Sequence, residues 1–515
     1  MSEQLRSALA RLPDLLGAHV LLAAAALALA LAVSLPLGIA AARRPVLARA
    51  VLGLASLVQT IPALALLALF YPLLLMLSAL VGGGIPALGF LPSLLALALY
   101  ALLPMLRNGV TGLLGIDSAV LEAADAVGMT RAQKLRLVEA PLAAPVAMAG
   151  IRTAAVWTIG AATLSTTVGQ PSLGDLIFAG LQTQNWVLVL VGCVAAAVLA
   201  LTVDAVLGLV ERAVRERRRM VGLVALGILL AGVLAAALPA LMPAPSRPVV
   251  TIGAKNFSEQ YILARLIGRR LEAAGYAVRY REGLGSAVIF RALAAGDIDV
   301  YVDYAGTLWT NEMRRTDVPA RATMLAAITR WAKAENGVDV IGPLGFENAY
   351  AFAVRGQDAR RLGLRTIDDL ARASPGMTLG SDLEFLERPE WAMVRQAYPL
   401  RFTATRAYSP TFMYRALESG QVDAISAFSS DGRIAALGLT VLGDPRGAIP
   451  GYDALLLASR RVARDAELRE VLKPLVGTIP VKRMREANYR VDRNDSAQQG
   501  AADAALWLDA TIAPR

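Results

Sequence analysis

The chain has 515 residues, of which 56% are apolar and only 18% are charged, a balance too apolar for a wholly soluble protein. Its formal net charge of +10 does not indicate a nucleic-acid partner, because the arginines stand beside apolar runs, as in the loops of membrane proteins. One cysteine, Cys193, and one histidine, His19, leave no cluster for a metal site or for nucleophilic catalysis. We therefore expect no metal and no cofactor.

Six apolar runs are long enough to cross the hydrocarbon core of a membrane as helices. We predict them over residues 15–40, 51–75, 90–106, 146–168, 186–210 and 221–242. The second run contains Pro62 and Pro72, so the sequence does not define its ends. The fourth contains Arg152, a charge that must face a helix interface or a cavity rather than lipid.

Basic residues fall in alternate loops between these runs. They follow the first span, lie between the third and fourth, and lie again between the fifth and sixth. Because lysine and arginine are enriched in cytoplasmic loops, these three loops are predicted to be cytoplasmic. The N-terminus and everything after the sixth span then lie outside. The chain is expected to be a multi-pass protein of the cytoplasmic (inner) membrane, with lipid around its spans.

Prolines at positions 243, 245 and 248 predict a short stiff linker after the last span. Beyond it, an amphipathic helix is predicted over 258–274, and strands over 249–254, 297–304, 349–354, 377–381, 422–428 and 453–459. Strands that alternate with helices favour an α/β sheet, and the length of this region favours two lobes. The predicted fold is an all-α polytopic membrane domain followed by a two-lobed α/β domain.

A weak internal repeat supports the two lobes. Residues 291–304 and 415–428 each combine the end of a helix at a glycine, Gly296 or Gly420, with a strand that closes on an aromatic residue, Tyr304 or Phe428. Similar units in two lobes would present these two aromatic residues from opposite sides of a cleft. Coincidence is the alternative, because helix–glycine–strand units are common.

A motif with a defined spacing lies in the loop of residues 117–145, between the third and fourth spans. It consists of Glu122, Ala123, Ala124, Gly128, Val138 and Pro141. The spacing predicts a short helix-turn-helix whose small residues allow another protein to approach closely; a solvated amphipathic helix is the alternative. The motif resembles the cytoplasmic EAA loop of bacterial ABC importer permeases, which implies that these six residues couple the chain to an ATPase.

The resemblance extends to residues 59–68, 102–108, 149–164 and 174–178, which are similar to the permeases of osmoprotectant (quaternary-amine) ABC importers. The sequence has no G-x-x-x-x-G-K-[ST] phosphate-binding loop, so ATP is expected to be used by a separate partner subunit. Such permeases work in pairs, which implies a homodimer of this chain with two ATPase subunits. Residues 1–215 are predicted to be the permease domain, and residues 216–247 an extra membrane helix and the linker.

Residues 253–263, 303–307 and 429–434 resemble the glycine betaine/choline-type binding proteins of the same importers. Residues 248–515 are therefore predicted to form an extracytoplasmic substrate-binding domain with the periplasmic-binding-protein fold. A quaternary ammonium is recognised by the faces of aromatic rings, and the resemblance implies a cage of Tyr304, Tyr350, Phe428 and Tyr452. It also implies anchors for the anionic or polar end of the ligand at Lys255, Thr307 and Arg388.

Each of these residues also has a purely structural interpretation. Tyrosines at strand ends commonly pack in a core or at a hinge, and Arg388 could cap a helix or pair with Glu390. Phe428 stands where relatives commonly carry tyrosine, so it keeps an aromatic face but loses a hydroxyl.

The expected function is the permease and substrate-binding subunit of an ATP-driven importer for a quaternary-amine solute such as glycine betaine, choline or carnitine. The missing hydroxyl at Phe428 leaves a bulkier trimethylated amino acid such as ergothioneine as an alternative substrate, and an ordinary amino acid as another. A ligand sensor would need a cytoplasmic output domain, for which the short cytoplasmic loops leave no room. The chain is not expected to be an enzyme.

Overall fold

The computed structural model describes residues 3–82, 85–182, 185–241, 248–493 and 499–512. The chain divides into two units. The helical unit comprises residues 1–178 and 187–244, and the α/β unit comprises residues 179–186 and 245–515. The predicted linker at prolines 243–248 and the predicted end of the sixth span at Met242 fall outside the described residues, apart from Pro248.

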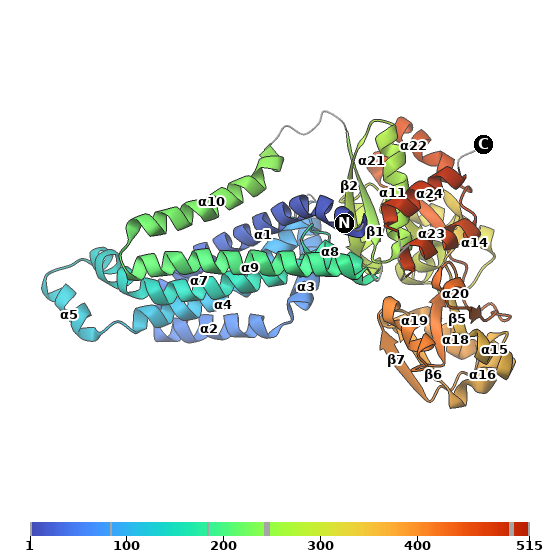
Figure 1. Cartoon of the computed structure of the whole chain (residues 1–515), viewed down its shortest axis with the longest axis horizontal. Coiled ribbons are helices and arrows are strands. Elements are labelled where there is room, and N and C mark those ends of the chain that lie inside the picture. Colours follow the sequence, from blue (N-terminus) through green and yellow to red (C-terminus); the bar gives the residue numbers. More distant parts are fainter. Residues whose placement is uncertain (1–2, 83–84, 183–184, 242–247, 494–498, 513–515) are drawn as a thin grey trace. The chain divides into compact units, whose positions relative to one another are not determined.

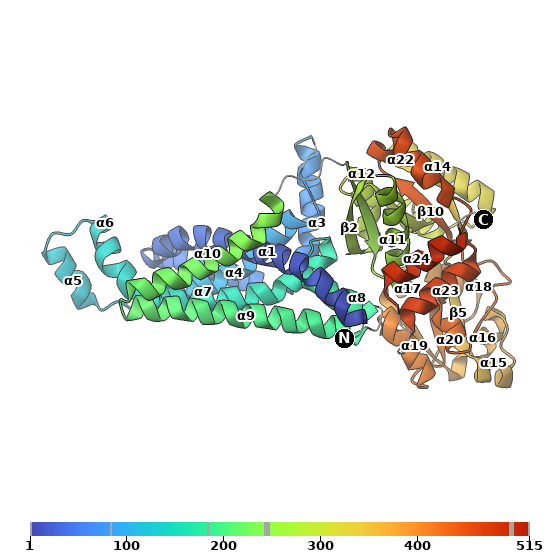
Figure 2. The same cartoon turned by 45° about the horizontal axis from the view of Figure 1, so that its top comes forward.

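The described part of the chain before residue 242 is all helical (Figures 1 and 2). Its segments are α1 (Glu3–Ala42), α2 (Pro45–Thr60), α3 (Ala63–Leu80), α4 (Phe90–Leu114), α5 (Ser118–Ala126), α6 (Arg131–Lys134), the π-helical η1 (Leu135–Glu139), α7 (Ala140–Ala162), the 3-10 helix η2 (Thr163–Val168), α8 (Gly174–Gln182), α9 (Trp186–Arg215) and α10 (Arg219–Leu241). Alanines and leucines of α1, α4 and α7 form a buried cluster, because small side chains let membrane helices pack closely.

Five helical stretches within the described residues are long and apolar enough to cross a membrane, namely Ala8–Ala42, Phe90–Leu114, Arg131–Val168, Trp186–Arg215 and Arg219–Leu238. The predicted second span is not one straight helix, which corrects the sequence-based expectation. Helices α2 and α3 meet at a bend of 101°. The bend lies at Pro62, which lacks a backbone N–H and disfavours helical geometry in the residue before it. Ile61 accordingly has extended backbone angles.

The α/β unit contains two five-stranded sheets, one in each lobe (Figure 1). The sheet of lobe 1 has the order β2-β1-β3-β10-β4, with β1 (Val249–Lys255), β2 (Ala277–Leu284), β3 (Val300–Tyr304), β4 (Asp339–Glu347) and β10 (Asp453–Ala458). The sheet of lobe 2 has the order β7-β6-β8-β5-β9, with β5 (Tyr350–Arg355), β6 (Thr378–Asp382), β7 (Ala404–Tyr408), β8 (Ala424–Phe428) and β9 (Leu439–Val441).

Helices cover both sheets. Those of lobe 1 are α11 (Ser258–Ala273), α12 (Ser286–Ala295), α13 (Ala305–Thr307), the π-helical η3 (Leu308–Glu312), α14 (Arg321–Asn336), α21 (Arg460–Ala463), α22 (Ala466–Leu472), the 3-10 helix η5 (Lys473–Leu475), α23 (Val481–Asp492) and α24 (Ala501–Ile512). Those of lobe 2 are α15 (Gly356–Leu362), α16 (Ile367–Ala373), the 3-10 helix η4 (Ser374–Gly376), α17 (Leu383–Glu387), α18 (Pro389–Ala397), α19 (Pro410–Glu418) and α20 (Arg433–Ala436).

The internal repeat is confirmed. In lobe 1, α12 is followed by Gly296 in the left-handed conformation and then by β3, which ends at Tyr304. In lobe 2, α19 is followed by Gly420, also left-handed, and then by β8, which ends at Phe428. The two lobes therefore place an aromatic residue at the end of equivalent strands.

The chain passes between the lobes twice, once between β4 and β5 and once between β9 and β10. A backbone hydrogen bond joins the two crossings, in which the N–H of Asn348 donates to the carbonyl oxygen of Tyr452 at 3.0 Å. Close by, the Ser429 N–H donates to the carbonyl oxygen of Ala349 at 2.8 Å. We call this pair of crossings the hinge.

Candidate functional site

A cavity of about 420 Å³ lies between the two lobes of the α/β unit. All seven residues predicted to bind the ligand line it, namely Lys255, Tyr304, Thr307, Tyr350, Arg388, Phe428 and Tyr452. They come from β1, β3, α13, β5, β8, the segment before α18 and the hinge. The fold thus gathers residues that lie up to two hundred positions apart in the sequence.

Five aromatic rings on the cavity wall form a continuous series, which we call the aromatic arc: Tyr304, Phe257, Phe428, Tyr350 and Tyr452. Neighbouring ring centroids are 6.2, 6.4, 4.9 and 5.8 Å apart in that order. Aromatic faces attract a cation that lies within about 6 Å of the ring centroid. The arc therefore offers several faces to one cationic group.

Buried carboxylates hold two of the three tyrosines of the arc by their hydroxyl groups, whereas the Tyr350 hydroxyl accepts a hydrogen bond from Arg388 Nη1 at 3.5 Å. The Tyr304 hydroxyl donates to Glu259 Oε1 at 2.6 Å, and the Tyr452 hydroxyl donates to Glu390 Oε1. Burial, with the adjacent Glu259 carboxylate, raises the pKa of Tyr304 well above its usual value, so this hydroxyl stays protonated and remains a donor. Gly306 admits the Tyr452 ring, because a Cβ at residue 306 would lie 2.3 Å from a ring carbon.

Arg388 reaches across the cleft with hydrogen-bonding capacity to spare. Its side chain is 5% exposed, and its Nη2 lies 3.3 Å from Thr307 Oγ1, on the opposite lobe. It lies at the N-terminal cap of α18 but makes no side-chain cap bond. Its carboxylate neighbours are loose, with Glu384 at 3.5 Å and Glu390 at 4.0 Å. The Nε atom is buried and has no hydrogen-bond partner among the described residues.

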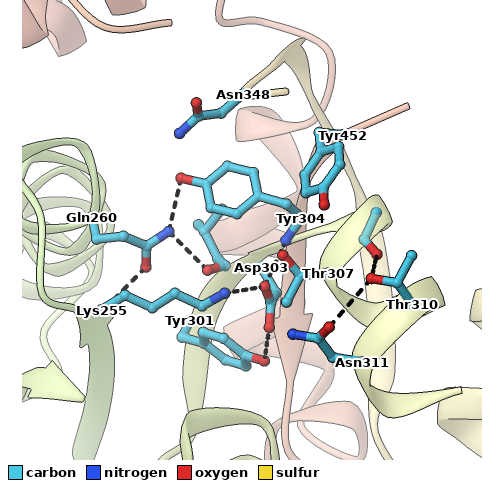
Figure 3. A network of polar contacts seen from close by, with 12 residues as sticks. Lys255, Gln260, Tyr301, Asp303, Tyr304, Thr307, Thr310, Asn311, Asn348 and Tyr452 are labelled. Atoms are coloured by element: carbon cyan, nitrogen blue, oxygen red, sulfur yellow. Dashed lines mark hydrogen bonds and ion pairs between the residues drawn. The ribbon is translucent and has the colours of Figure 1, made fainter. Parts of the chain in front are cut away.

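Lys255 differs from Arg388 because its charge is already paired. Its Nζ lies 2.5 Å from Asp303 Oδ1, and both side chains are almost fully buried. Asp303 in turn accepts a hydrogen bond from the Tyr301 hydroxyl at 2.6 Å (Figure 3). The Lys255 ammonium also lies 5.4 Å from the centroid of the Tyr304 ring. Lys255 thus stabilises the wall around Tyr304, and its role as an anchor for a ligand stays a prediction.

Several residues that line the cavity were not predicted from the sequence, namely Phe257, Glu259, Asn348, Ser430, Asn488 and Asp492. Phe257 and Glu259 stand inside the same short motif as Lys255, at the turn from β1 to α11, so their position was a usable signal. Asn488 and Asp492 lie on α23. They are more than 180 positions away in the sequence from β1 and β3, the strands beside which they line the cavity. Only the fold brings them to the site.

Burial raises the pKa values of two acids of this wall. Burial raises the pKa of Glu259, although hydrogen bonds from Ser430, Tyr304 and two asparagines oppose the rise. Burial also raises the pKa of Asp492 to about 7. Among the residues that the structure describes, no group of three or more His, Cys, Asp or Glu side chains is arranged to hold a metal ion.

In the helical unit, the predicted coupling motif forms two short helices joined by a turn. Helix α5 carries Glu122, Ala123 and Ala124, and Gly128 follows it with φ +76°, a conformation that glycine adopts without strain. Helix α6 starts at a capping box of Thr130 and Gln133 and continues through η1, which contains Val138, into α7, where Pro141 lies in the first turn.

This helix-turn-helix stands out beyond the ends of the long helices (Figures 1 and 2). Lys134 links its two helices by an ion pair with Asp125 at 2.7 Å. Its surface exposes Val127 and Leu137, whose exposed fractions are 73% and 66%. Ala124 is buried, whereas Glu122, Ala123 and Gly128 are exposed. The segment therefore presents exposed apolar side chains on its surface, and its coupling to an ATPase stays a prediction.

Arg152 confirms the expectation for a charge within a span, since it faces another helix. On α7, it donates two parallel hydrogen bonds to Asp204 of α9, at 3.0 and 2.9 Å. A third, at 2.7 Å, goes to Glu211 of α9. Bidentate pairing is the strongest geometry that a guanidinium and a carboxylate can adopt. This charged cluster fastens α7, the continuation of the coupling segment, to α9.

Comparison with known proteins agrees with this architecture. The family described as the substrate binding domain of the ABC-type glycine betaine transport system matches residues 248–509, half of the chain. The family described as the binding-protein-dependent transport system inner membrane component matches residues 34–216.

Individual relatives match one or both parts. The ergothioneine transport permease/ergothioneine binding protein EgtU of Helicobacter pylori (strain G27) is 29% identical over 84% of this chain and 78% of its own length. The glycine betaine/carnitine/choline transport system permease protein OpuCB of Bacillus subtilis (strain 168) is 41% identical over 39% of this chain and 87% of its own length. A crystal structure of a glycine betaine/carnitine/choline ABC transporter is 28% identical, with a TM-score of 0.45, over 50% of this chain and 96% of that one.

The two family matches fall on different parts of one polypeptide, and neither family is catalytic. A permease of this class works with an ATPase subunit, and its binding domain lies outside the cytoplasmic membrane that the helices span. The chain therefore belongs to the binding-protein-dependent ABC importers of the glycine betaine/choline type, as a membrane permease fused to its substrate-binding domain.

Proposed function

We propose that the imported substrate is a zwitterionic trimethylammonium compound, a betaine, rather than a simple quaternary amine. The observation that carries this proposal is the buried Arg388, whose Nε has no partner among the described residues and which lines the same cavity as the aromatic arc. The arc supplies faces for the cationic end of the ligand. The arginine supplies a planar donor group for a carboxylate at the other end.

The dimensions of the two features support one ligand that touches both. The guanidinium of Arg388 lies 5.2 Å from the centroid of the Tyr350 ring, and Tyr350 belongs to the arc. A carboxylate on Arg388 and a trimethylammonium group on the neighbouring rings would therefore be separated by a few bonds, as they are in betaines. Choline would leave the free donor of Arg388 unpaired in a buried site, which costs about 1–3 kcal/mol.

Within the betaines, the candidates are glycine betaine, carnitine and a trimethylated amino acid such as ergothioneine. The relative from Helicobacter pylori, which is named for ergothioneine, matches across both parts of this chain. The relatives named for glycine betaine, carnitine and choline match the permease part. An ordinary amino acid fits less well, because its ammonium group needs hydrogen-bond acceptors rather than aromatic faces.

The proposed transport cycle uses the features of both units. Ligand closes the lobes, the loaded domain delivers it to the permease, and ATP-driven movement of the partner ATPase acts through the coupling segment. Glu122, Ala123, Ala124, Gly128, Val138 and Pro141 are the proposed contact with that ATPase. The working assembly is proposed to be a homodimer of this chain, each copy bound to one ATPase subunit.

Titration calorimetry on the full chain in lipid nanodiscs tests the substrate. The ligands are glycine, N,N-dimethylglycine, glycine betaine, choline, carnitine, ergothioneine and unmethylated amino acids. We expect the tightest binding for trimethylated zwitterions, weaker binding for choline, none for unmethylated amino acids, and a loss of at least tenfold in betaine affinity on Tyr452→Ala or Tyr304→Ala. Binding of unmethylated amino acids in place of betaines, or betaine binding that both substitutions leave unchanged, would contradict the proposal.

A further inference from the structure

A buried carboxylate organises the end of the cavity around Tyr304. Glu259 is 2% exposed, and each of its oxygens accepts two hydrogen bonds. Oε1 accepts from the Tyr304 hydroxyl at 2.6 Å and from Asn348 Nδ2 at 3.1 Å. Oε2 accepts from the Ser430 hydroxyl at 2.6 Å and from Asn488 Nδ2 at 2.8 Å. The carboxylate is therefore fully used by the protein.

Glu259 fixes which way the two amide side chains are turned. An amide oxygen placed against a carboxylate would be repelled, so both asparagines must present their nitrogen to Glu259. For Asn488 a second bond fixes the same orientation, because its Nδ2 also donates to the Ser430 carbonyl oxygen at 2.9 Å. Figure 3 shows the nitrogen of Asn348 on the side of the Tyr304 hydroxyl and its oxygen turned away.

This orientation leaves two acceptors without donors. Asn348 Oδ1 and Asn488 Oδ1 are buried and accept no hydrogen bond from the described residues. Asn348 is 6% exposed and Asn488 is 3% exposed. Both residues line the cavity between the lobes. Buried polar atoms are nearly always paired in folded proteins, so a group that enters the cavity is the natural source of the missing donors.

We propose that Asn348 and Asn488 form a donor-recognition subsite, which selects betaines that carry an N–H or O–H group in addition to the carboxylate and the trimethylammonium. This inference rests on the proposed function, since it names the third point of contact of the same ligand. Two acceptors from different elements, the hinge and α23, suit two donors on one rigid group, such as the two N–H groups of an imidazole-2-thione ring.

The subsite separates the candidate substrates by their chemistry. Glycine betaine has no donor, so it would leave both amide oxygens unpaired in the closed site. Carnitine has one hydroxyl donor. Ergothioneine has two ring N–H donors, one for each amide. Discrimination of this kind is strong, because a site built to hydrogen-bond a ligand group penalises an analogue that lacks it.

Matched ligands test the subsite on the unaltered full chain in nanodiscs. One pair is carnitine and 4-(trimethylammonio)butanoate, which lacks only the hydroxyl. The other pair is ergothioneine and its derivative methylated on both ring nitrogens. In whichever pair binds, we expect the donor-bearing member to bind roughly tenfold or more tightly, since an unpaired buried acceptor is penalised on that scale. Equal affinities within the pair, or glycine betaine binding as tightly as the donor-bearing member, would overturn the inference.

Variants identify the residues. Asn488→Leu and Asn348→Leu should each weaken the donor-bearing ligand by roughly tenfold and change its donor-free partner much less. Ser430→Ala is the matched control, because it also removes a hydrogen bond to Glu259 but leaves both unpaired amide oxygens in place, and it should weaken both members equally. Equal weakening of both members by the asparagine variants would mean a merely structural role. If no betaine binds the unaltered chain at all, the proposed function fails instead, and the two failures are thereby distinguished.

Discussion

Each unit of this protein contains an arginine placed between two carboxylates, and the two sites differ in how completely the arginine is used. In the helical unit, Arg152 makes three hydrogen bonds of 3.0 Å or less to Asp204 and Glu211. In the α/β unit, Arg388 has its carboxylate neighbours at 3.5 and 4.0 Å and a buried Nε without a partner among the described residues.

The difference separates an arginine that holds a structure together from one that is available to a ligand. A guanidinium whose three nitrogens all donate to carboxylates has its charge already paired, so Arg152 fastens α7 to α9. An unsaturated one in a cavity gains from a carboxylate that enters. The presence of two carboxylate neighbours alone does not make this distinction, whereas the hydrogen-bond geometry does.

The largest effect on ligand affinity is expected from Arg388→Met in the full chain. The affinity for carboxylate-bearing betaines should fall about 100-fold, which corresponds to about 2.7 kcal/mol, because the ligand carboxylate would be buried without its partner. Choline, which has no carboxylate, should change by much less. Calorimetric titration measures both. Arg395→Met, an exposed arginine on the same helix α18, is the control. An equal loss for choline and the betaines would show that Arg388 is structural, like Arg152.

A pH scan extends the comparison to a third ionisable side chain, Asp492, which lines the binding cavity. Burial raises the pKa of Asp492 from an ordinary 3.8 to about 7. The folded state therefore retains a proton that the unfolded state has released, and stability falls as the pH rises from about 4 to about 7. Asp492→Asn should raise the stability of the α/β unit by about 2–4 kcal/mol at pH 8, since each pKa unit corresponds to about 1.4 kcal/mol. The lower part of this range allows for the lost attraction to Arg433.

The melting transition of the α/β unit, followed at pH 4 and pH 8, measures this effect. The gain from Asp492→Asn should shrink to less than about 1 kcal/mol at pH 4, where the natural side chain is protonated in the folded state and only about half ionised in the unfolded state. A gain that is the same at both pH values would show that the raised pKa does not control stability.

Arg152→Met tests the opposite member of the comparison. It leaves Asp204 and Glu211 without their cation, and breaking a buried pair costs about 3–5 kcal/mol. The Arg152 side chain is 33% exposed, so we expect about 2–3 kcal/mol, read as a lower melting temperature of the helical unit with ligand affinity unchanged. The triple change Arg152→Met, Asp204→Asn and Glu211→Gln should recover part of the loss. Arg107 is an exposed arginine of α4, and Arg107→Met serves as the control. A similar loss of stability in this control would show that the ion pairs of Arg152 have no specific stabilising role.

The smallest effect is expected in the aromatic arc. Phe428→Leu keeps an apolar side chain but removes the aromatic face, so trimethylammonium ligands should bind about 2- to 10-fold more weakly, from a cation–π contribution of about 0.5–1.4 kcal/mol. Phe385→Leu is a matched control, since the ring centroids of Phe385 and Tyr350 are 4.6 Å apart but Phe385 does not line the cavity. Equal losses from both substitutions would point to packing rather than to the ammonium.

The strands that the sequence predicts and those that it misses follow a physical rule. The six predicted strands became β1, β3, β5, β6, β8 and β10, all of them interior to their sheets. The four missed strands, β2, β4, β7 and β9, are the four edges. Interior strands are buried on both faces and read as continuous apolar runs. Edge strands such as β7, with three exposed residues out of five, carry no such pattern.

The candidate site follows a similar rule. Four of the aromatic residues and Arg388 could be named because the resemblance to a family of binding proteins implies them, and all seven named residues line one cavity. Pairing could not be predicted from sequence, because it depends on distances across the fold. Lys255 stands in a motif as prominent as that of Tyr304, yet its charge is taken by Asp303, 48 positions away. Asn488 has no motif at all, and only α23 packed against the cavity reveals it.

The hydrogen bond between Asn348 and Tyr452 at the hinge has a consequence for the order of events during capture. It ties the two crossings at the pivot, beside Tyr350 and Tyr452, whereas the contact of Arg388 with Thr307 spans the two lobes. Opening the lobes about this pivot would separate Arg388 from Thr307 but move the two tyrosines little. The cationic group of a ligand would then bind first, to the aromatic rings, and its carboxylate would contact Arg388 only when the lobes close. Molecules that carry the cationic group alone would occupy the site without closing the lobes, and would inhibit uptake rather than be transported.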